Sequence, residues 1–239
     1  MERKLFCILS LFLICSIYIF GEDFPKKAET INDFIPKGWK EILATSGDLN
    51  KDKLEDVVII IEKDDEKNIK KNNTMGPNYL NLNPRILLIL FKQKDGTYIL
   101  VDKNDKGFIQ SENDEKNPTL MDTLSGIDIK SNTLKISHDY FLSVETWSAL
   151  QSVFSFRFQN NRFELIGFDN NLFVRNSGEQ EKFSINFLTN KIKTTSGGNI
   201  FNKKLNNPKE KWGNNNIKKK YILEEMTKDT LDEILDYLY

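Results

Sequence analysis

The chain has 239 residues, of which 34 are Lys or Arg and 35 are Asp or Glu, so its formal net charge is −1 at pH 7. A charge so close to zero produces no general attraction to nucleic acid or to an anionic membrane. We therefore expect no nucleic-acid partner, and the function must be sought in local patterns along the chain.

The first residues have the order of charged and apolar residues that is typical of a secretory signal. Arg3 and Lys4 precede an apolar run of about 16 residues, Leu5–Phe20, which is followed by the small residue Gly21. The run is shorter than the roughly 20 residues of a membrane-spanning helix. We therefore predict that residues 1–21 are a signal peptide and that no stable membrane span remains after its cleavage.

Two alternatives to cleavage follow from the same segment. Ile19 is bulkier than the residue usually found two places before a cleavage site, which favours an uncleaved interfacial anchor. Cys15 offers a site for lipid attachment, but Ile14 stands where a small residue normally precedes the modified cysteine. In each case we expect the chain to be exported, to the periplasm or the cell surface.

Both cysteines, Cys7 and Cys15, lie in the predicted signal. The remaining chain can therefore form neither a disulfide nor a thiolate metal site. Its stability must come from a hydrophobic core, and its length suits one large domain. We predict that residues 22–239 form a single exported β-rich domain.

The first predicted strands are two continuous apolar runs. Val57–Ile61 and Ile86–Phe91 have no polar residue, which is typical of strands buried on both faces. Asp95-Gly96 follows the second run and predicts a hairpin turn into Thr97–Val101. The polar segments 62–84 and 103–123 are predicted to be long loops.

The later strands show alternating patterns joined by short turns. Ser131-Asn132 and Asn160-Asn161 each separate two alternating runs and predict β-hairpins. Near the carboxyl end the period changes, and Thr230 and Glu233 have the spacing of a helix capping box. The predicted fold class is α+β and strand-dominant: an antiparallel β meander with long loops and a C-terminal helix.

One loop carries recognisable site chemistry, the acidic segment 48–56 directly before the first buried strand. Calcium prefers six to eight oxygen ligands, and this spacing lets several oxygens turn inward. The predicted ligands are the side chains of Asp48, Asn50, Asp52 and Asp56 and the carbonyl oxygen of Leu54. The loop is not an EF-hand, because Ile59 stands where that motif has its bidentate Glu. The alternative is an acidic turn that caps the strand without metal.

The sequence from Gly47 to Asp52, followed by Asp56-Val57-Val58, resembles the calcium loop of FG-GAP and VCBS-type repeats. The chain has one such copy, which does not indicate a propeller. These loops usually have Gly at the sixth position, where the backbone is left-handed. Lys53 would adopt that conformation at a cost of about 1 kcal/mol.

A second resemblance spans most of residues 34–195. The chain is similar there to a family of uncharacterised exported proteins of Gram-negative bacteria, which implies an envelope location and a shared fold but no activity. The segments that carry the resemblance are Phe34–Trp39, the acidic loop, Pro84–Phe91, Phe156–Asn160, Phe163–Gly167 and Ile185–Thr189.

Two functional hypotheses remain. The first is a non-enzymatic binding module whose loops bind an envelope protein or a glycan, with calcium stiffening the acidic loop. The second is a hydrolase of envelope or extracellular polymers, with a pocket joining Asp139, Glu145 and Trp147. No catalytic motif surrounds His138, the only histidine, which is interpreted as a loop residue. Trp39, Trp147 and Trp212 would form either a sugar-binding platform or part of the core.

Overall fold

The computed structural model describes residues 23–142, 144, 147–202, 204 and 207–237. The predicted signal peptide and Glu145 therefore lie outside the described residues. Among the described residues, strands make up 52% and helical residues 8%, in antiparallel sheets with one short C-terminal helix. The predicted α+β, strand-dominant class is confirmed.

The first half of the chain forms a five-stranded antiparallel sheet in the order β1-β7-β6-β3-β2. Neither β3 nor β6 lies at an edge of the sheet, and both are buried almost throughout, as their apolar runs predict. The strands are β1 (Lys27–Ala28), β2 (Trp39–Gly47), β3 (Asp56–Lys63), β6 (Arg85–Lys92) and β7 (Tyr98–Asn104).

The second half forms a seven-stranded antiparallel meander in which each strand pairs with the next along the chain. Ser131-Asn132 and Asn160-Asn161 connect neighbouring strands with positive φ angles, as expected of hairpin turns. The strands are β8 (Leu124–Lys130), β9 (Thr133–Phe141), β10 (Ser148–Gln159), β11 (Arg162–Val174), β12 (Glu179–Asn186), β13 (Lys191–Asn199) and β14 (Lys209–Asn214).

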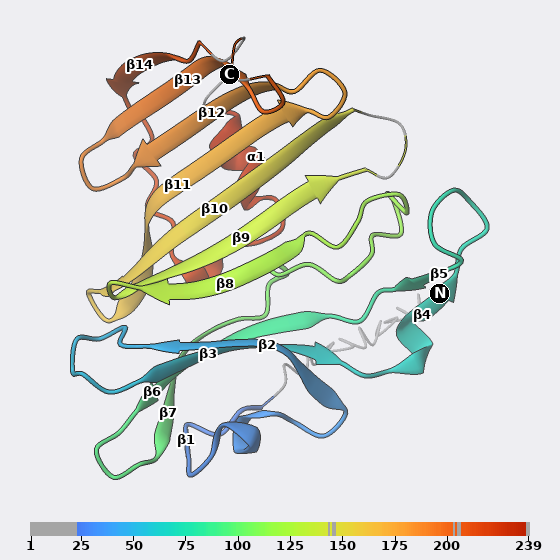
Figure 1. The fold of residues 1–239 in the computed structure, drawn as a ribbon. Helices are drawn as coiled ribbons and strands as arrows, with labels where there is room; N and C mark the ends of the chain where they lie inside the picture. The colour runs from blue at the N-terminus through green and yellow to red at the C-terminus, as the bar shows by residue number, and fades with distance from the viewer. Residues whose placement is uncertain (1–22, 143, 145–146, 203, 205–206, 238–239) are drawn as a thin grey trace, which may run out of the picture.

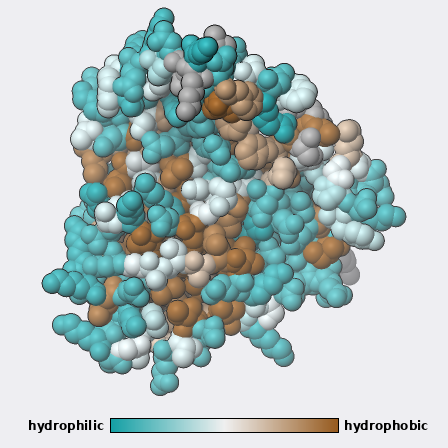
Figure 2. Space-filling model, in the orientation of Figure 1, coloured by the Kyte–Doolittle hydropathy of each residue, from teal (hydrophilic) through white to brown (hydrophobic). Residues whose placement is uncertain are grey.

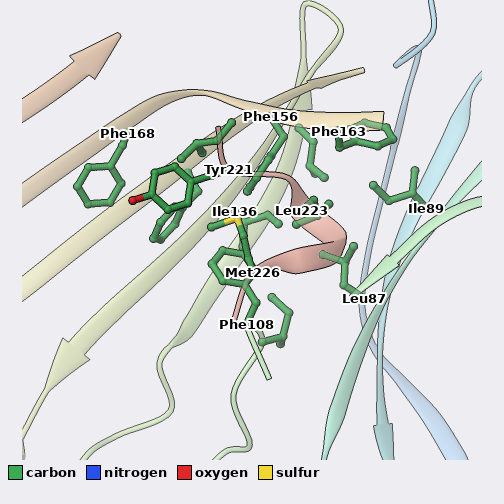
Figure 3. Packing of buried hydrophobic residues seen from close by; sticks show 14 of the residues in the cluster. Leu87, Ile89, Phe108, Ile136, Phe156, Phe163, Phe168, Tyr221, Leu223 and Met226 are labelled. Atoms are coloured by element: carbon green, nitrogen blue, oxygen red, sulfur yellow. The ribbon is translucent and has the colours of Figure 1, made fainter. Parts of the chain in front are cut away.

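The two sheets share one hydrophobic core, which the C-terminal segment completes (Figure 3). Leu87 and Ile89 of the first sheet and Phe156 and Phe163 of the second belong to the same buried cluster. The 3-10 helix η3 (Leu223–Glu225) and the helix α1 (Thr230–Leu235) contribute to it as well. A second cluster packs the 3-10 helix η1 (Ile31–Phe34) on the other face of the five-stranded sheet.

Two details of the sequence prediction need correction. The segment 103–123 is not only polar loop, because Phe108 and Ile109 are buried in the shared core. The segment 62–84 also contains ordered elements: η2 (Glu66–Asn68) and a hairpin of β4 (Ile69–Lys71) and β5 (Tyr79–Asn81).

The predicted capping box is also wrong. The N-cap of α1 is Asp229, and Thr230 is the first helical residue. The Thr230 hydroxyl accepts a hydrogen bond from the Thr227 N–H at 2.9 Å, and Glu233 pairs with Lys219. The side chains of Thr230 and Glu233 therefore bond to partners other than those of a capping box.

The seven-stranded sheet is covered on one face only. Figure 1 shows α1 behind this sheet, while the face turned to the viewer carries no described helix. Figure 2 shows hydrophilic side chains over much of that face, and hydrophobic ones gathered in the middle, where β8 and β2 meet. No described helix is long and apolar enough to cross a membrane.

Candidate functional site

The acidic loop is a tight turn held by its own side chains. The Asp48 carboxylate accepts hydrogen bonds from the N–H groups of Lys51 and Lys53, at 2.6 and 3.1 Å. Asn50 accepts from the Asp52 N–H at 2.9 Å, and Asp52 accepts from the Leu54 N–H at 2.8 Å. Lys53 has a φ of +71°, the left-handed conformation that the sequence predicts there.

Asp56 differs from the other predicted ligands in its exposure, because its side chain is completely buried. One carboxylate oxygen accepts from the Leu49 N–H at 2.9 Å and the other from the Lys92 N–H at 3.1 Å. Burial raises the pKa of Asp56 to about 6, and these hydrogen bonds oppose the rise. Asp56 therefore ties the loop to strand β6.

The loop also joins the two sheets. Leu49 is buried in the shared core, and the Asp48 carbonyl accepts from the Asn132 side chain at 2.6 Å. Asn132 belongs to the β8–β9 turn of the second sheet. A Cβ placed on Gly47 would lie 2.6 Å from the Ile129 side chain, so only Gly allows this close approach.

The fit of the loop to calcium is partial. Asp48, Asn50 and Asp52 bring hard oxygen donors to one partly exposed turn, which suits the ion. Asp56 does not fit as readily, because both of its oxygens are buried and already bonded to backbone N–H groups. Among the residues that the structure describes, no group of three His, Cys, Asp or Glu side chains is arranged around a common point.

A second candidate site lies on the open face of the seven-stranded sheet. A cleft of about 800 Å³ crosses strands β8 to β14, a volume in the range of ligand-binding pockets. We call it the sheet groove. Most of its lining side chains are polar: Ser125, Ser137, Asp139, Gln151, Asp169, Asn170, Asn171, Gln180, Lys182, Ser184, Lys193, Thr195 and Glu210, together with Val153, Phe183, Gly198 and Pro208.

Strand register places most of these residues in two rows across the sheet. Successive residues of a strand point to opposite faces, so the neighbours of buried core residues point into the groove. One row runs Asp139, Gln151, Asn171, Lys182, Thr195 and Glu210 from β9 to β14. The parallel row runs Ser137, Val153, Asp169, Ser184, Lys193 and Trp212.

Three amide side chains form a hydrogen-bonded ladder in the groove. The Asn171 Nδ2 donates to the Gln151 Oε1 at 3.1 Å, and the Gln180 Nε2 donates to the Asn171 Oδ1 at 2.7 Å. The ladder fixes the orientation of the amides across β10, β11 and β12. It leaves the Gln151 amino group as a donor and the Gln180 carbonyl oxygen as an acceptor for a ligand.

The charged residues of the groove divide into paired and unpaired side chains. Lys193 and Glu210 form an ion pair at 2.9 Å, and the Lys193 ammonium lies 5.6 Å from the centre of the Trp212 ring. The side chains of Asp139, Asp169 and Lys182 have no hydrogen bond or ion pair with any described residue. These three charges are available to a ligand.

The tryptophans have separate environments. Trp39 packs against the second core cluster, whereas Trp212 and Trp147 are 65% and 63% exposed. Trp212 stands on the groove face, since its register partner is Lys193. Sequence reasoning left the choice between platform and core open, and the structure gives one residue to the core and two to the surface.

His138 is not a loop residue, as its sequence context suggested, but a core residue of β9 with 1% of its surface exposed. Its Nδ1 lies 3.3 Å from the Tyr140 hydroxyl, and its ring packs against Phe108 and Phe154. Burial lowers the pKa of His138 to about 4. It faces away from Asp139, its neighbour in the chain, and so takes no part in the groove.

Comparison with family models, with curated protein sequences and with solved structures found no match for this chain. Function is therefore inferred from the geometry of the acidic loop and the sheet groove.

The sheet groove was not predicted from the sequence. Its signal was present as the polar half of each alternating strand, for example Gln151 and Val153 between core residues of β10. Alternation predicts that such residues leave the core, but it does not predict whether another described element covers the outer face of the sheet.

Proposed function

We propose that this chain is an exported, non-enzymatic binding module that holds a glycan in the sheet groove. The observation that carries the proposal is the amide ladder of Gln151, Asn171 and Gln180 within a cleft of about 800 Å³. Sugar hydroxyls both donate and accept hydrogen bonds, and amide side chains offer both functions at fixed positions.

Two further features support a glycan. The ladder holds its side chains in place before the ligand arrives, so less conformational entropy is lost on binding. Trp212 offers a large exposed ring at the β14 end of the groove, on which the C–H face of a sugar could pack. This arrangement differs from the sequence hypothesis, because the sheet rather than the loops provides the surface.

In this proposal calcium has a supporting role at the acidic loop. Asp48, Asn50 and Asp52 would hold the ion, which would neutralise the turn and stiffen it. The loop connects the two sheets through Leu49 and Asn132, so stiffening it would hold the seven-stranded sheet in place relative to the first.

A hydrolase remains the second candidate because Asp139 and Asp169 both line the groove without a partner. Such a pair could serve as the acid and the base of glycoside cleavage. Of the other residues predicted for this activity, Trp147 is exposed just before β10 and Glu145 lies outside the described residues.

The test of glycan binding is titration of the protein with neutral and charged oligosaccharides, followed by calorimetry. Trp212→Ala and Asn171→Ala should each weaken binding by roughly tenfold, since each removes a ligand contact or breaks the ladder. Tyr79→Ala is the matched control, because Tyr79 is 63% exposed on the β4–β5 hairpin, away from the groove. Failure of the protein to bind any oligosaccharide would overturn the proposal.

The same samples distinguish binding from hydrolysis. A binding module leaves the oligosaccharide intact after prolonged incubation, as judged by chromatography of the products. Shortened products that disappear with both Asp139→Asn and Asp169→Asn would instead establish the hydrolase.

A further inference from the structure

Two of the three unpaired charges of the sheet groove lie at separate positions in one row. Asp139 on β9 and Lys182 on β12 are joined through Gln151 and Asn171, which are successive register partners. Three strand spacings separate the backbones of Asp139 and Lys182 by roughly 14 Å, the length of about three sugar rings. Between β9 and β12 the row is therefore negative at one end, neutral in the middle and positive at the other.

A third unpaired charge lies beside this row, on the strand adjacent to that of Lys182. Asp169, also unpaired, belongs to the adjacent row on β11 and adds a second negative group to the groove. Lys193 and Glu210 cancel each other through their ion pair, so Lys182 is the one groove cation that no described carboxylate neutralises. The strands fix the backbone positions from which these charged side chains extend.

From this pattern we infer that the sheet groove selects a zwitterionic glycan, a carbohydrate chain that carries both free amines and acidic groups. The inference rests on the proposed glycan-binding function and narrows its ligand class. The acidic group pairs with Lys182, the amine pairs with Asp139 or Asp169, and the hydroxyls between them meet the amide ladder. Lys182 and one of the two aspartates thereby each gain a partner of opposite charge that the protein alone does not supply.

The test uses four oligosaccharide probes of equal length with the full exported protein. The zwitterionic probe is de-N-acetylated hyaluronan, and its acid-only parent is hyaluronan itself. A chitosan oligomer supplies amines only, and a chitin oligomer supplies neither charge. We expect the zwitterionic probe to bind at least tenfold more tightly than each of the other three, and the preference to weaken as salt is added.

Two variants separate the two ends of the row. Lys182→Met should remove the preference for the zwitterion over chitosan, while Asp139→Asn combined with Asp169→Asn should remove its preference over hyaluronan. Lys211→Met and Asp128→Asn are matched controls, because both residues are exposed and neither lines the groove. The controls should keep both preferences, and circular dichroism should show every variant folded.

The other possible binding results would overturn either the charge selection or the glycan-binding function itself. Equal affinity for chitin and for the zwitterionic probe would overturn the charge selection and leave the glycan-binding function intact. Binding of a zwitterionic peptide without binding of any saccharide would overturn both. Retention of both preferences in the groove variants would show that Lys182, Asp139 and Asp169 do not select the ligand. This result would also overturn the inference.

Discussion

Buried titratable side chains make the stability of the protein depend on pH. Asp102 of β7 is 7% exposed, and its carboxylate oxygens lack a described hydrogen-bond partner at normal distance. Burial and the nearby Glu224 raise the pKa of Asp102 to about 7, and the N–H groups of Lys103 and Phe163 offset this only in part. The folded state therefore prefers the protonated acid.

The first prediction follows from the sign of this shift. The folded pKa lies above the unfolded value of 3.8, so the contribution of Asp102 is present below pH 4 and is lost as the pH rises through 7. Asp102→Asn should raise the free energy of unfolding by about 2 kcal/mol at pH 8 and change it little at pH 4. Urea unfolding at the two pH values measures the difference. Equal effects at both would contradict the prediction.

His138 has the opposite pH dependence. Its folded pKa of about 4 lies below the ordinary histidine value of 6.5, because burial disfavours the imidazolium. Stability is therefore present above pH 6.5 and lost as the pH falls towards 4. We predict that His138→Leu removes most of this loss between pH 6.5 and 4, which thermal unfolding at several pH values would detect. A variant that keeps the full wild-type loss would point to other groups.

At the level of elements, the acidic loop is where the metal prediction is tested. If Asp48, Asn50 and Asp52 hold calcium, a calcium concentration of 100 times the dissociation constant should add about 2.7 kcal/mol to the free energy of unfolding. Thermal unfolding with calcium and then with a chelator measures this. Asp52→Ala should abolish the shift.

Glu55→Ala is the control for that experiment, because Glu55 is exposed in the same loop but lies outside the predicted ligand positions. It should keep the calcium-dependent shift. No shift in the wild-type protein would leave the loop as a metal-free turn, which the buried Asp56 side chain ties to β6.

The strands, turns and helices also differ in how well the sequence predicts them. The strands β3 and β6, the Asn-Asn hairpin turn and the C-terminal helix were predicted because each depends on local periodicity or turn chemistry. The start of α1 was misplaced by one residue, since the Thr230 hydroxyl accepts from the preceding Thr227 N–H and does not cap the helix. Phe108 was assigned to a loop because its sequence neighbours are polar, although its ring meets Phe154 and Phe156.

For the whole molecule, the shared core implies that the two sheets unfold together. The C-terminal segment bridges them: the Asn104 side chain on β7 donates to the Leu223 and Met226 carbonyls at 2.6 and 2.8 Å. The Leu165 N–H on β11 donates to the Tyr221 carbonyl of the same segment at 2.9 Å. Removing either connection should weaken both sheets.

We predict one cooperative transition with two local reporters. A variant that keeps only Trp39 reports on the five-stranded sheet, and one that keeps only Trp212 reports on the seven-stranded sheet. Their fluorescence midpoints in urea should coincide. Asn104→Ala should lower the free energy of unfolding by about 2 kcal/mol and shift both midpoints equally, since it leaves two buried carbonyls without their donor. Separate midpoints would show that the sheets are independent domains.

The amino-acid sequence by itself determined the strand-dominant class, the antiparallel hairpins and the doubly buried strands β3 and β6, because local periodicity and turn residues act over a few positions. The tertiary structure alone decided which faces meet and which stay open. Asp139, Asn171 and Lys182 are far apart along the chain, and only strand register brings them into one row. The sheet groove exists because the five-stranded sheet and the C-terminal segment bury one face of the meander and leave the other uncovered.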